Sequence, residues 1–122
     1  LHDFARTVAQ KVAPLGEDAV QVVGDPEMIV QHPSIGVGCG GPGEDMIDIG
    51  SDVLIMCFDG ASYWSQRERF AEQGVGVITL EHGTTEMWGM ESLARYIADT
   101  WPDLDVHYLD RHWKAWHVTA DG

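Results

Sequence analysis

The stretch Val75-Gly-Val-Ile-Thr-Leu-Glu-His-Gly-Thr-Thr-Glu86 decides the fold, because an apolar run passes directly into a helix-like one. Residues 76–79 are predicted to form a strand, and residues 85–100 to form a helix. In open α/β sheets, ligand-binding groups lie where a strand gives way to a helix. His82 and Glu86 are four residues apart in this stretch, so they share one face of a helical turn. Such a pair could grip a metal ion or form only a surface hydrogen bond.

The rest of the chain alternates between helix-like and strand-like segments. The predicted helix 85–100 has one apolar stripe, formed by Met90, Leu93, Ala94, Ile97 and Trp101. Further helices are expected over 1–13, 44–49 and 61–73, and further strands over 19–23, 34–38, 52–57 and 104–109. The uninterrupted apolar run at 52–57 is typical of a strand buried on both faces. This order predicts a single α/β domain over 1–122, a three-layer α/β/α fold with a mostly parallel sheet.

The composition excludes several classes of function. Seven Lys and Arg stand against twenty Asp and Glu, a formal charge of −13, which argues against sequence-independent binding to nucleic acid. No apolar segment is long enough to span a bilayer and no secretion signal is visible, so we expect a cytoplasmic protein without a membrane partner. Cys39 and Cys57 do not have the C-x-x-C spacing of metal sites, so free thiols are expected.

A glycine-rich stretch, Gly38-Cys-Gly-Gly-Pro-Gly43, lies between a predicted strand and a predicted helix. It satisfies the G-x-G-x-x-G pattern, so a nucleotide-binding loop is one hypothesis. Pro42 lacks one of the N–H donors that such a loop needs, and the helix that follows is short. A tight turn that requires small residues for close packing is the better interpretation.

Asp59 directly follows the buried strand over 52–57. In a parallel sheet it would face the same rim as His82, and the two could share a site. Alternatively, Asp59 caps the helix that is expected to start at Ala61. The sequence leaves both interpretations open.

The sequence gives weaker evidence that several aromatic and histidine side chains belong to a binding site. Tyr63, Trp64 and Trp88 follow the two rim loops and could stack on a planar ligand, although packing in the core or at an interface is favoured. The C-terminal His107, His112 and His117, with Trp113 and Trp116, do not have the spacing of a metal clamp and predict an exposed aromatic strand or a contact to another chain.

Over residues 22–110 the chain resembles the NIF-three-like family, hexameric proteins with a dinuclear metal centre that are often described as GTP cyclohydrolase I type 2 homologues. Four stretches carry the resemblance. In order they are Val23-Gly-Asp25 with the glycine-rich turn that follows it, Gly50-Ser-Asp-Val-Leu-Ile-Met-Cys-Phe-Asp59, Gly74 to Glu86, and a closing strand at Asp103-Leu-Asp-Val-His-Tyr-Leu-Asp110. His82, Thr85 and Glu86 match the family's G-H-x-x-T-E motif, in which Glu81 replaces the usual Gly.

The resemblance implies that His82 and Glu86 are ligands of a two-metal centre holding divalent Zn, Mn, Fe or Co. Asp59 would then lie behind the ligands or on the substrate side. The family's other ligands, a His-His pair and an Asp, lie in its N-terminal half and have no counterpart here, so we expect the chain to be the C-terminal part of such a protein. Many members have a His where Tyr63 and Trp64 stand in this chain.

The function expected from the resemblance is metal-dependent hydrolysis of an unknown substrate by a homo-oligomer, a hexamer in the family. The alternative is a non-catalytic assembly or regulatory protein that keeps the fold. The Trp-rich C-terminal segment and the missing family His motivate this alternative.

Overall fold

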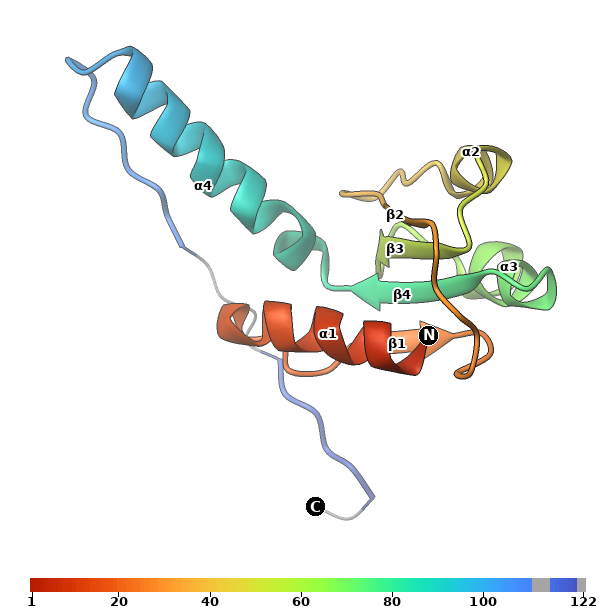
Figure 1. Cartoon of the computed structure of the whole chain (residues 1–122). Coiled ribbons are helices and arrows are strands. Elements are labelled where there is room, and N and C mark those ends of the chain that lie inside the picture. Colours follow the sequence, from red (N-terminus) through yellow and green to blue (C-terminus); the bar gives the residue numbers. More distant parts are fainter. Residues whose placement is uncertain (111–114, 121–122) are drawn as a thin grey trace.

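The protein is built around a four-stranded sheet with the strand order β1-β4-β3-β2 (Figure 1). The structure, a computed structural model, describes residues 1–110 and 115–120. Strand β2 pairs in parallel with β3, and β3 in parallel with β4, whereas β1 pairs antiparallel with β4. The predicted mostly parallel sheet is therefore confirmed. The strands are β1 (Gln21–Val23), β2 (Pro33–Ile35), β3 (Val53–Cys57) and β4 (Gly76–Leu80).

The helices lie close to the predicted positions, with one difference in type. The segment predicted as one helix over 61–73 contains a π-helix, Tyr63–Glu68, followed by a short α-helix. None of the helices among the described residues is long and apolar enough to cross a membrane. The α-helices are α1 (His2–Val12), α2 (Gly43–Asp48), α3 (Arg69–Glu72) and α4 (His82–Thr100), and a 3-10 turn, Ala13–Leu15, follows α1.

The core has two halves, one on each face of the sheet. On one face, Val53 and Ile78 pack with Leu1 and Ala5 around helix α1. On the other face, the sheet packs against residues from α2, α3 and their flanking loops. This second cluster contains Met46, Leu54, Met56, Ala61, Phe70, Val75 and Val77. Alternate residues of β3 enter the two halves, as a strand buried on both faces requires. The three-layer α/β/α architecture is confirmed.

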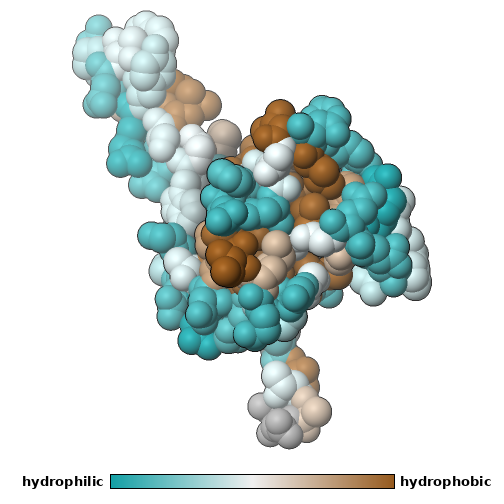
Figure 2. Space-filling view, turned by 45° about the vertical axis from the view of Figure 1, so that its right-hand side comes forward, coloured by the Kyte–Doolittle hydropathy of each residue, from teal (hydrophilic) through white to brown (hydrophobic). Residues whose placement is uncertain are grey.

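Helix α4 projects away from the sheet (Figure 1). It begins at His82, three residues before the predicted start, because the Glu81 carboxylate accepts a hydrogen bond from the Thr84 N–H and caps the helix. Only Thr84 and Met87 of this helix are buried. Its predicted apolar stripe is largely exposed: Met90, Leu93 and Trp101 are about half accessible. Figure 2 shows hydrophobic surface on this projecting arm as well as on the body.

The strand predicted over 104–109 is wrong. Residues 105–110 have no regular secondary structure and pair with no strand. They run back alongside α4 (Figure 1), where the Tyr108 hydroxyl donates to the Met87 carbonyl at 3.4 Å. A helix bonds its own backbone groups internally and offers no free edge, so an alternating pattern beside it cannot form a ladder.

Candidate functional site

The candidate site lies where the parallel strands β3 and β4 end side by side. Their register pairs Cys57 with Leu80, and the Phe58 N–H extends the pairing by donating to the Leu80 carbonyl at 2.6 Å. The residues that follow the two strands therefore emerge at the same rim of the sheet. In this way Asp59 and His82 meet, although they are 23 positions apart in the sequence.

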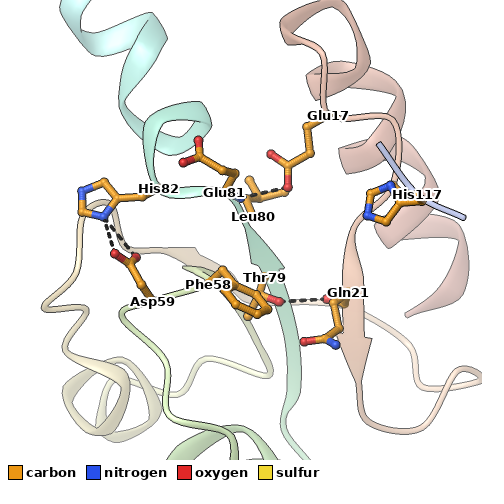
Figure 3. Close-up of a pocket in the computed structure, with 10 residues that line it drawn as sticks. Glu17, Gln21, Phe58, Asp59, Thr79, Leu80, Glu81, His82 and His117 are labelled. Atoms are coloured by element: carbon orange, nitrogen blue, oxygen red, sulfur yellow. Dashed lines mark hydrogen bonds and ion pairs between the residues drawn. The ribbon is translucent and has the colours of Figure 1, made fainter. Parts of the chain in front are cut away.

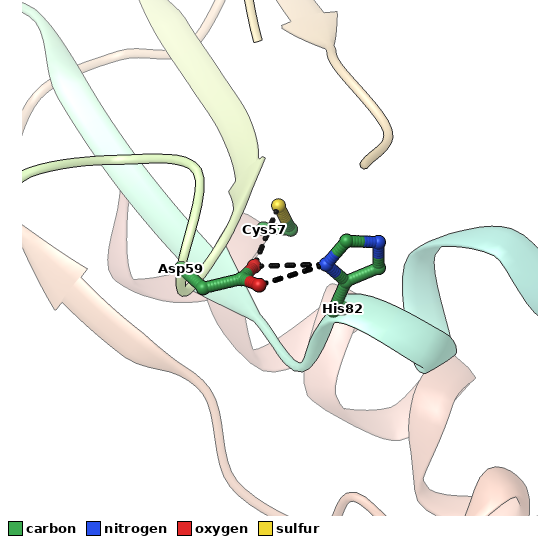
Figure 4. Close-up of side chains that lie close together, drawn as sticks. All are labelled: Cys57, Asp59 and His82. Atoms are coloured by element: carbon green, nitrogen blue, oxygen red, sulfur yellow. Dashed lines mark hydrogen bonds and ion pairs between the residues drawn. The ribbon is translucent and has the colours of Figure 1, made fainter. Parts of the chain in front are cut away.

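At this rim the His82 imidazole contacts the Asp59 carboxylate. The His82 Nδ1 lies 3.0 Å from Asp59 Oδ1 and 2.9 Å from Oδ2 (Figures 3 and 4). Hydrogen bonding to Asp59 raises the pKa of His82, and the same bond lowers the pKa of Asp59. Asp59 is not a helix cap, because Ser62 is the N-cap residue of the helical segment that follows. The structure therefore supports the interpretation in which Asp59 lies beside His82.

Glu86 approaches the same imidazole from its other side. Its Oε1 lies 3.3 Å from His82 Nε2, and both side chains are partly exposed. The contact follows from helical spacing, since α4 starts at His82 and the two residues stand one turn apart. The imidazole thus lies between two carboxylates, with one at each ring nitrogen.

Cys57 is a member of the site that the sequence analysis missed. Its thiol donates to Asp59 Oδ1 at 3.2 Å (Figure 4). Ligand atoms of Cys57, Asp59 and His82 all lie within 4.8 Å of one another, so this group could hold a metal ion. Burial, together with the hydrogen bond to Asp59, raises the pKa of the Cys57 thiol to about 11. The sequence feature that could have identified Cys57 is its position at the end of a buried strand, two residues before Asp59.

Two arrangements of metal ligands share His82. One uses its Nε2 with Glu86, and the other uses its Nδ1 with Asp59 and Cys57. Imidazole and carboxylate suit Zn, Mn, Fe or Co, and a thiolate favours Zn or Fe. A neutral, buried Cys57 must lose its proton before it can bind a metal, which favours the first arrangement. Neither arrangement reaches the four ligands of a closed structural site.

A pocket of about 410 Å³ adjoins the Asp59–His82 pair (Figure 3). Glu17, which the sequence analysis did not single out, is buried in its wall and accepts a hydrogen bond from the Glu81 N–H at 2.8 Å. Burial raises the pKa of Glu17. This carboxylate ties the segment before β1 to the start of α4. The pocket is lined by Glu17, Ala19, Gln21, Phe58, Asp59, Thr79, Leu80, Glu81, His82 and His117.

The glycine-rich turn packs closely against the core, as the favoured interpretation predicts. A Cβ at Gly43 would lie 2.8 Å from the Phe70 ring, and one at Gly41 would lie 3.0 Å from the Met56 methyl group. Real Cβ atoms tolerate neither distance without movement of a neighbour. At the other end of the turn, a Cβ at Gly38 would lie 3.1 Å from Glu86 Oε1. The turn therefore packs on the core at one end and borders the candidate site at the other.

The remaining aromatic and histidine residues are not gathered at the rim. Tyr63, Trp64 and Trp88 are exposed, with Tyr63 and Trp64 in an edge-to-face contact at 4.9 Å, so they do not pack in the core. His107 pairs with Asp105. Of the two C-terminal histidines that the structure describes, His117 reaches the pocket and pairs with Asp18 at 3.4 Å. Trp116 is exposed. His112 and Trp113 lie outside the described residues.

Comparisons with known proteins identify the fold. No family model matches the sequence. No curated protein is a significant match either. Among solved structures, Staphylococcus aureus protein SA1388 aligns over 81% of this chain and 30% of its own, with a TM-score of 0.61 and 22% identity. A Bacillus cereus protein related to NIF3 aligns over 98% of this chain and 31% of its own, with a TM-score of 0.60 and 20% identity. The chain therefore has a NIF3-like fold and spans less than a third of these proteins' length.

Proposed function

We propose that this chain supplies His82 and Glu86 as ligands to a dinuclear metal centre in a NIF-three-like protein that acts as a metal-dependent hydrolase. The substrate is not identified. The observation that carries the proposal is the position of the His82 imidazole, with Asp59 on Nδ1 at 2.9 Å and Glu86 on Nε2 at 3.3 Å.

Asp59 has a positioning role in this proposal. Metal-binding histidines commonly donate their other ring N–H to a carboxylate, which fixes the tautomer and the orientation of the ring. Asp59 accepts such a bond from Nδ1, so the lone pair of Nε2 is directed toward Glu86 once the imidazole is neutral. Hydrogen bonding to Asp59 raises the pKa of His82, so a metal ion that binds Nε2 competes with a proton. The affinity of the site for metal should therefore fall at acidic pH.

The metal chemistry depends on groups beyond these two ligands. When bound, a pair of adjacent divalent ions polarises a substrate and lowers the pKa of water enough to provide hydroxide at neutral pH. Two side chains do not hold two ions, so the remaining ligands must come from elsewhere in the full-length protein. By itself, the chain from Leu1 to Gly122 should bind metal weakly.

Metal analysis of the full-length protein tests the ligand assignment. We expect the H82A variant to lose most of the bound metal, because it removes the nitrogen ligand. H107A is the matched control, since His107 is an exposed histidine paired to Asp105 outside the site. Equal metal content in the wild type and H82A would rule out His82 as a ligand.

The alternative is a non-catalytic homo-oligomer that keeps the fold, and the exposed apolar residues of α4 favour it. Met90 and Leu93 on α4, and Trp101 directly after it, are about half exposed, and the helix buries only two of its residues. Such a patch is typical of a surface for protein contact. Screening the full-length protein against nucleotides and cyclic amides, with and without added metal, separates the two functions. Metal-dependent turnover would exclude the non-catalytic one.

A further inference from the structure

Cys39 and Cys57 both lie next to Gly60, and the missing side chain of this glycine leaves a gap between them. Cys39 lies in the turn between β2 and α2 and is exposed, whereas Cys57 ends β3 and is buried. A Cβ at Gly60 would lie 2.7 Å from the Cys57 sulfur and 3.0 Å from the Cys39 Cα. The Cys57 sulfur and the Cys39 backbone therefore lie on either side of the same atom-sized gap.

The Cys57 thiol already points at the turn that carries Cys39. It donates a hydrogen bond to the carbonyl of Gly38, the residue directly before Cys39. Asp59 Oδ1, at 3.2 Å, is the alternative acceptor for the single proton of this thiol. The sulfur thus faces both its nearest rim carboxylate and the backbone next to the second cysteine.

The turn has the freedom to bring the two sulfurs together. A disulfide needs Cα atoms roughly 4.4–6.8 Å apart, so bond formation requires the turn to place the Cys39 Cα within this range of the Cys57 Cα. Gly38 has a φ of 73°, and no atom lies within 4 Å of where a Cβ on Gly40 would be. Glycines therefore flank Cys39 on both sides, one of them in open space, and glycine accepts backbone angles that other residues do not.

We propose that Cys39 and Cys57 form a reversible intramolecular disulfide when the protein meets a peroxide. Disulfides in reducing compartments are usually transient and redox-sensing, which is the role proposed here. The bond would draw the Cys57 sulfur away from Asp59 and fasten the turn beside His82 and Glu86.

The order of the two steps follows from exposure. The exposed Cys39 sulfur attacks one peroxide oxygen and the O–O bond breaks, which leaves a sulfenic acid on Cys39 and releases water. The Cys57 sulfur then attacks the Cys39 sulfur, the S–O bond breaks, and a second water leaves with the Cys57 proton. Two thiols and one hydrogen peroxide thus give one disulfide and two waters. A dithiol reductant reverses the reaction by thiol–disulfide exchange.

Burial decides which cysteine meets the oxidant. Cys39 is exposed and Cys57 is buried, so a peroxide in solution reaches the Cys39 sulfur first. Cys57 is therefore protected from direct oxidation and serves as the resolving thiol.

The effect on the metal site rests on the proposed function, but formation of the disulfide does not. Gly38 N–H donates to Thr85 Oγ1 at 3.5 Å, and a Cβ on Gly38 would lie 3.1 Å from Glu86 Oε1. A turn fastened to Cys57 would move relative to these residues. The test is therefore run with a chelator present, so that a failure of the metal proposal cannot be mistaken for a failure of this one.

The test treats the full-length protein with hydrogen peroxide, then denatures it in N-ethylmaleimide and measures its intact mass without reductant. We expect a product lighter by two hydrogen atoms, neither of these cysteines alkylated, and a proteolytic peptide pair that links Cys39 to Cys57. Dithiothreitol should restore both thiols. In C39S, an exposed and conservative change, Cys57 should remain fully alkylatable after the same treatment.

Two outcomes would overturn the proposal. One is a peroxide product in which Cys39 is a sulfinic acid or joins two chains while Cys57 stays alkylatable. The other is oxidation of Cys57 in C39S at the wild-type rate, which would show that Cys57 does not depend on Cys39. Because C39S leaves the buried position intact, neither outcome depends on whether a Cys57 variant folds.

Discussion

The central strands and the helix α4 both carry apolar patterns, yet the strands are buried whereas the apolar stripe of α4 is largely exposed. Leu54, Val77 and Ile78 are inaccessible to solvent, whereas Met90 and Leu93 are about half exposed. The strands are covered by α1 on one face and by α2 and α3 on the other. Periodicity therefore identifies the apolar face of an element, but it does not identify what covers that face.

The largest expected effect comes from truncating one side chain that covers the central strands and one on α4. F70A should lower the free energy of unfolding by about 3–5 kcal/mol, because it opens a cavity beneath the sheet. L93A should change it by less than about 0.5 kcal/mol in the monomer, since Leu93 is half exposed. Urea denaturation of both variants measures the difference. A cost of several kcal/mol for L93A would show that α4 is covered in solution.

Replacing one glycine in the layer that covers the strands and one in α4 by alanine should change stability less, and with opposite signs. G43A should lower the free energy of unfolding by about 1–3 kcal/mol, because its Cβ would lie 2.8 Å from the Phe70 ring. G89A should raise it by about 0.5–1 kcal/mol, since Gly89 lies inside α4 with no atom within 4 Å of a Cβ. Thermal melts of the two variants check the signs. A stabilised G43A would contradict the close packing of the turn.

How well the sequence predicted each element depended on whether its partners were recognisable. The buried run at β3 and the passage from β4 into α4 were predicted because each pattern is local and strong. The residues 104–109 alternate like a strand but lie beside a helix, and alternation alone cannot reveal that no edge is available.

The candidate site was also predicted only in part. The His82–Glu86 contact follows from helical spacing, and the meeting of Asp59 with His82 was one of two open interpretations based on parallel topology. Cys57 was missed because its role comes from a carboxylate two residues on and a turn 19 residues before it. Glu17 was missed because it reaches Glu81 from 64 residues away, with no motif around either.

The smallest effect on stability is the pH dependence of the Asp59–His82 pair. The pKa of His82 is raised above its ordinary 6.5, so its contribution to stability is present below pH 6.5 and is lost as pH rises through the raised value. The pKa of Asp59 is lowered below 3.8, so its contribution is present above pH 3.8 and is lost as pH falls through the lowered value. The pair therefore stabilises the fold most between these two limits.

A pH titration of the His82 ring protons by NMR, with a chelator present to remove metal, checks this pH dependence. D59N should lower the pKa of His82, because it removes the largest cause of the upward shift. D105N is the matched control, since Asp105 pairs with His107 at a distance from the rim. An unchanged His82 pKa in D59N would contradict the ion pair.

The central claim is that Asp59 orients His82 so that Nε2, beside Glu86, is the ligand nitrogen. It is tested most directly by titrating Zn²⁺ into the full-length protein with ¹⁵N-labelled histidine and following the two ring nitrogens of His82. The account predicts that Nε2 shifts on binding while Nδ1 keeps its proton. A shift of Nδ1 instead would assign the metal to the Cys57–Asp59 side, and no shift at either nitrogen would contradict a metal site at this rim.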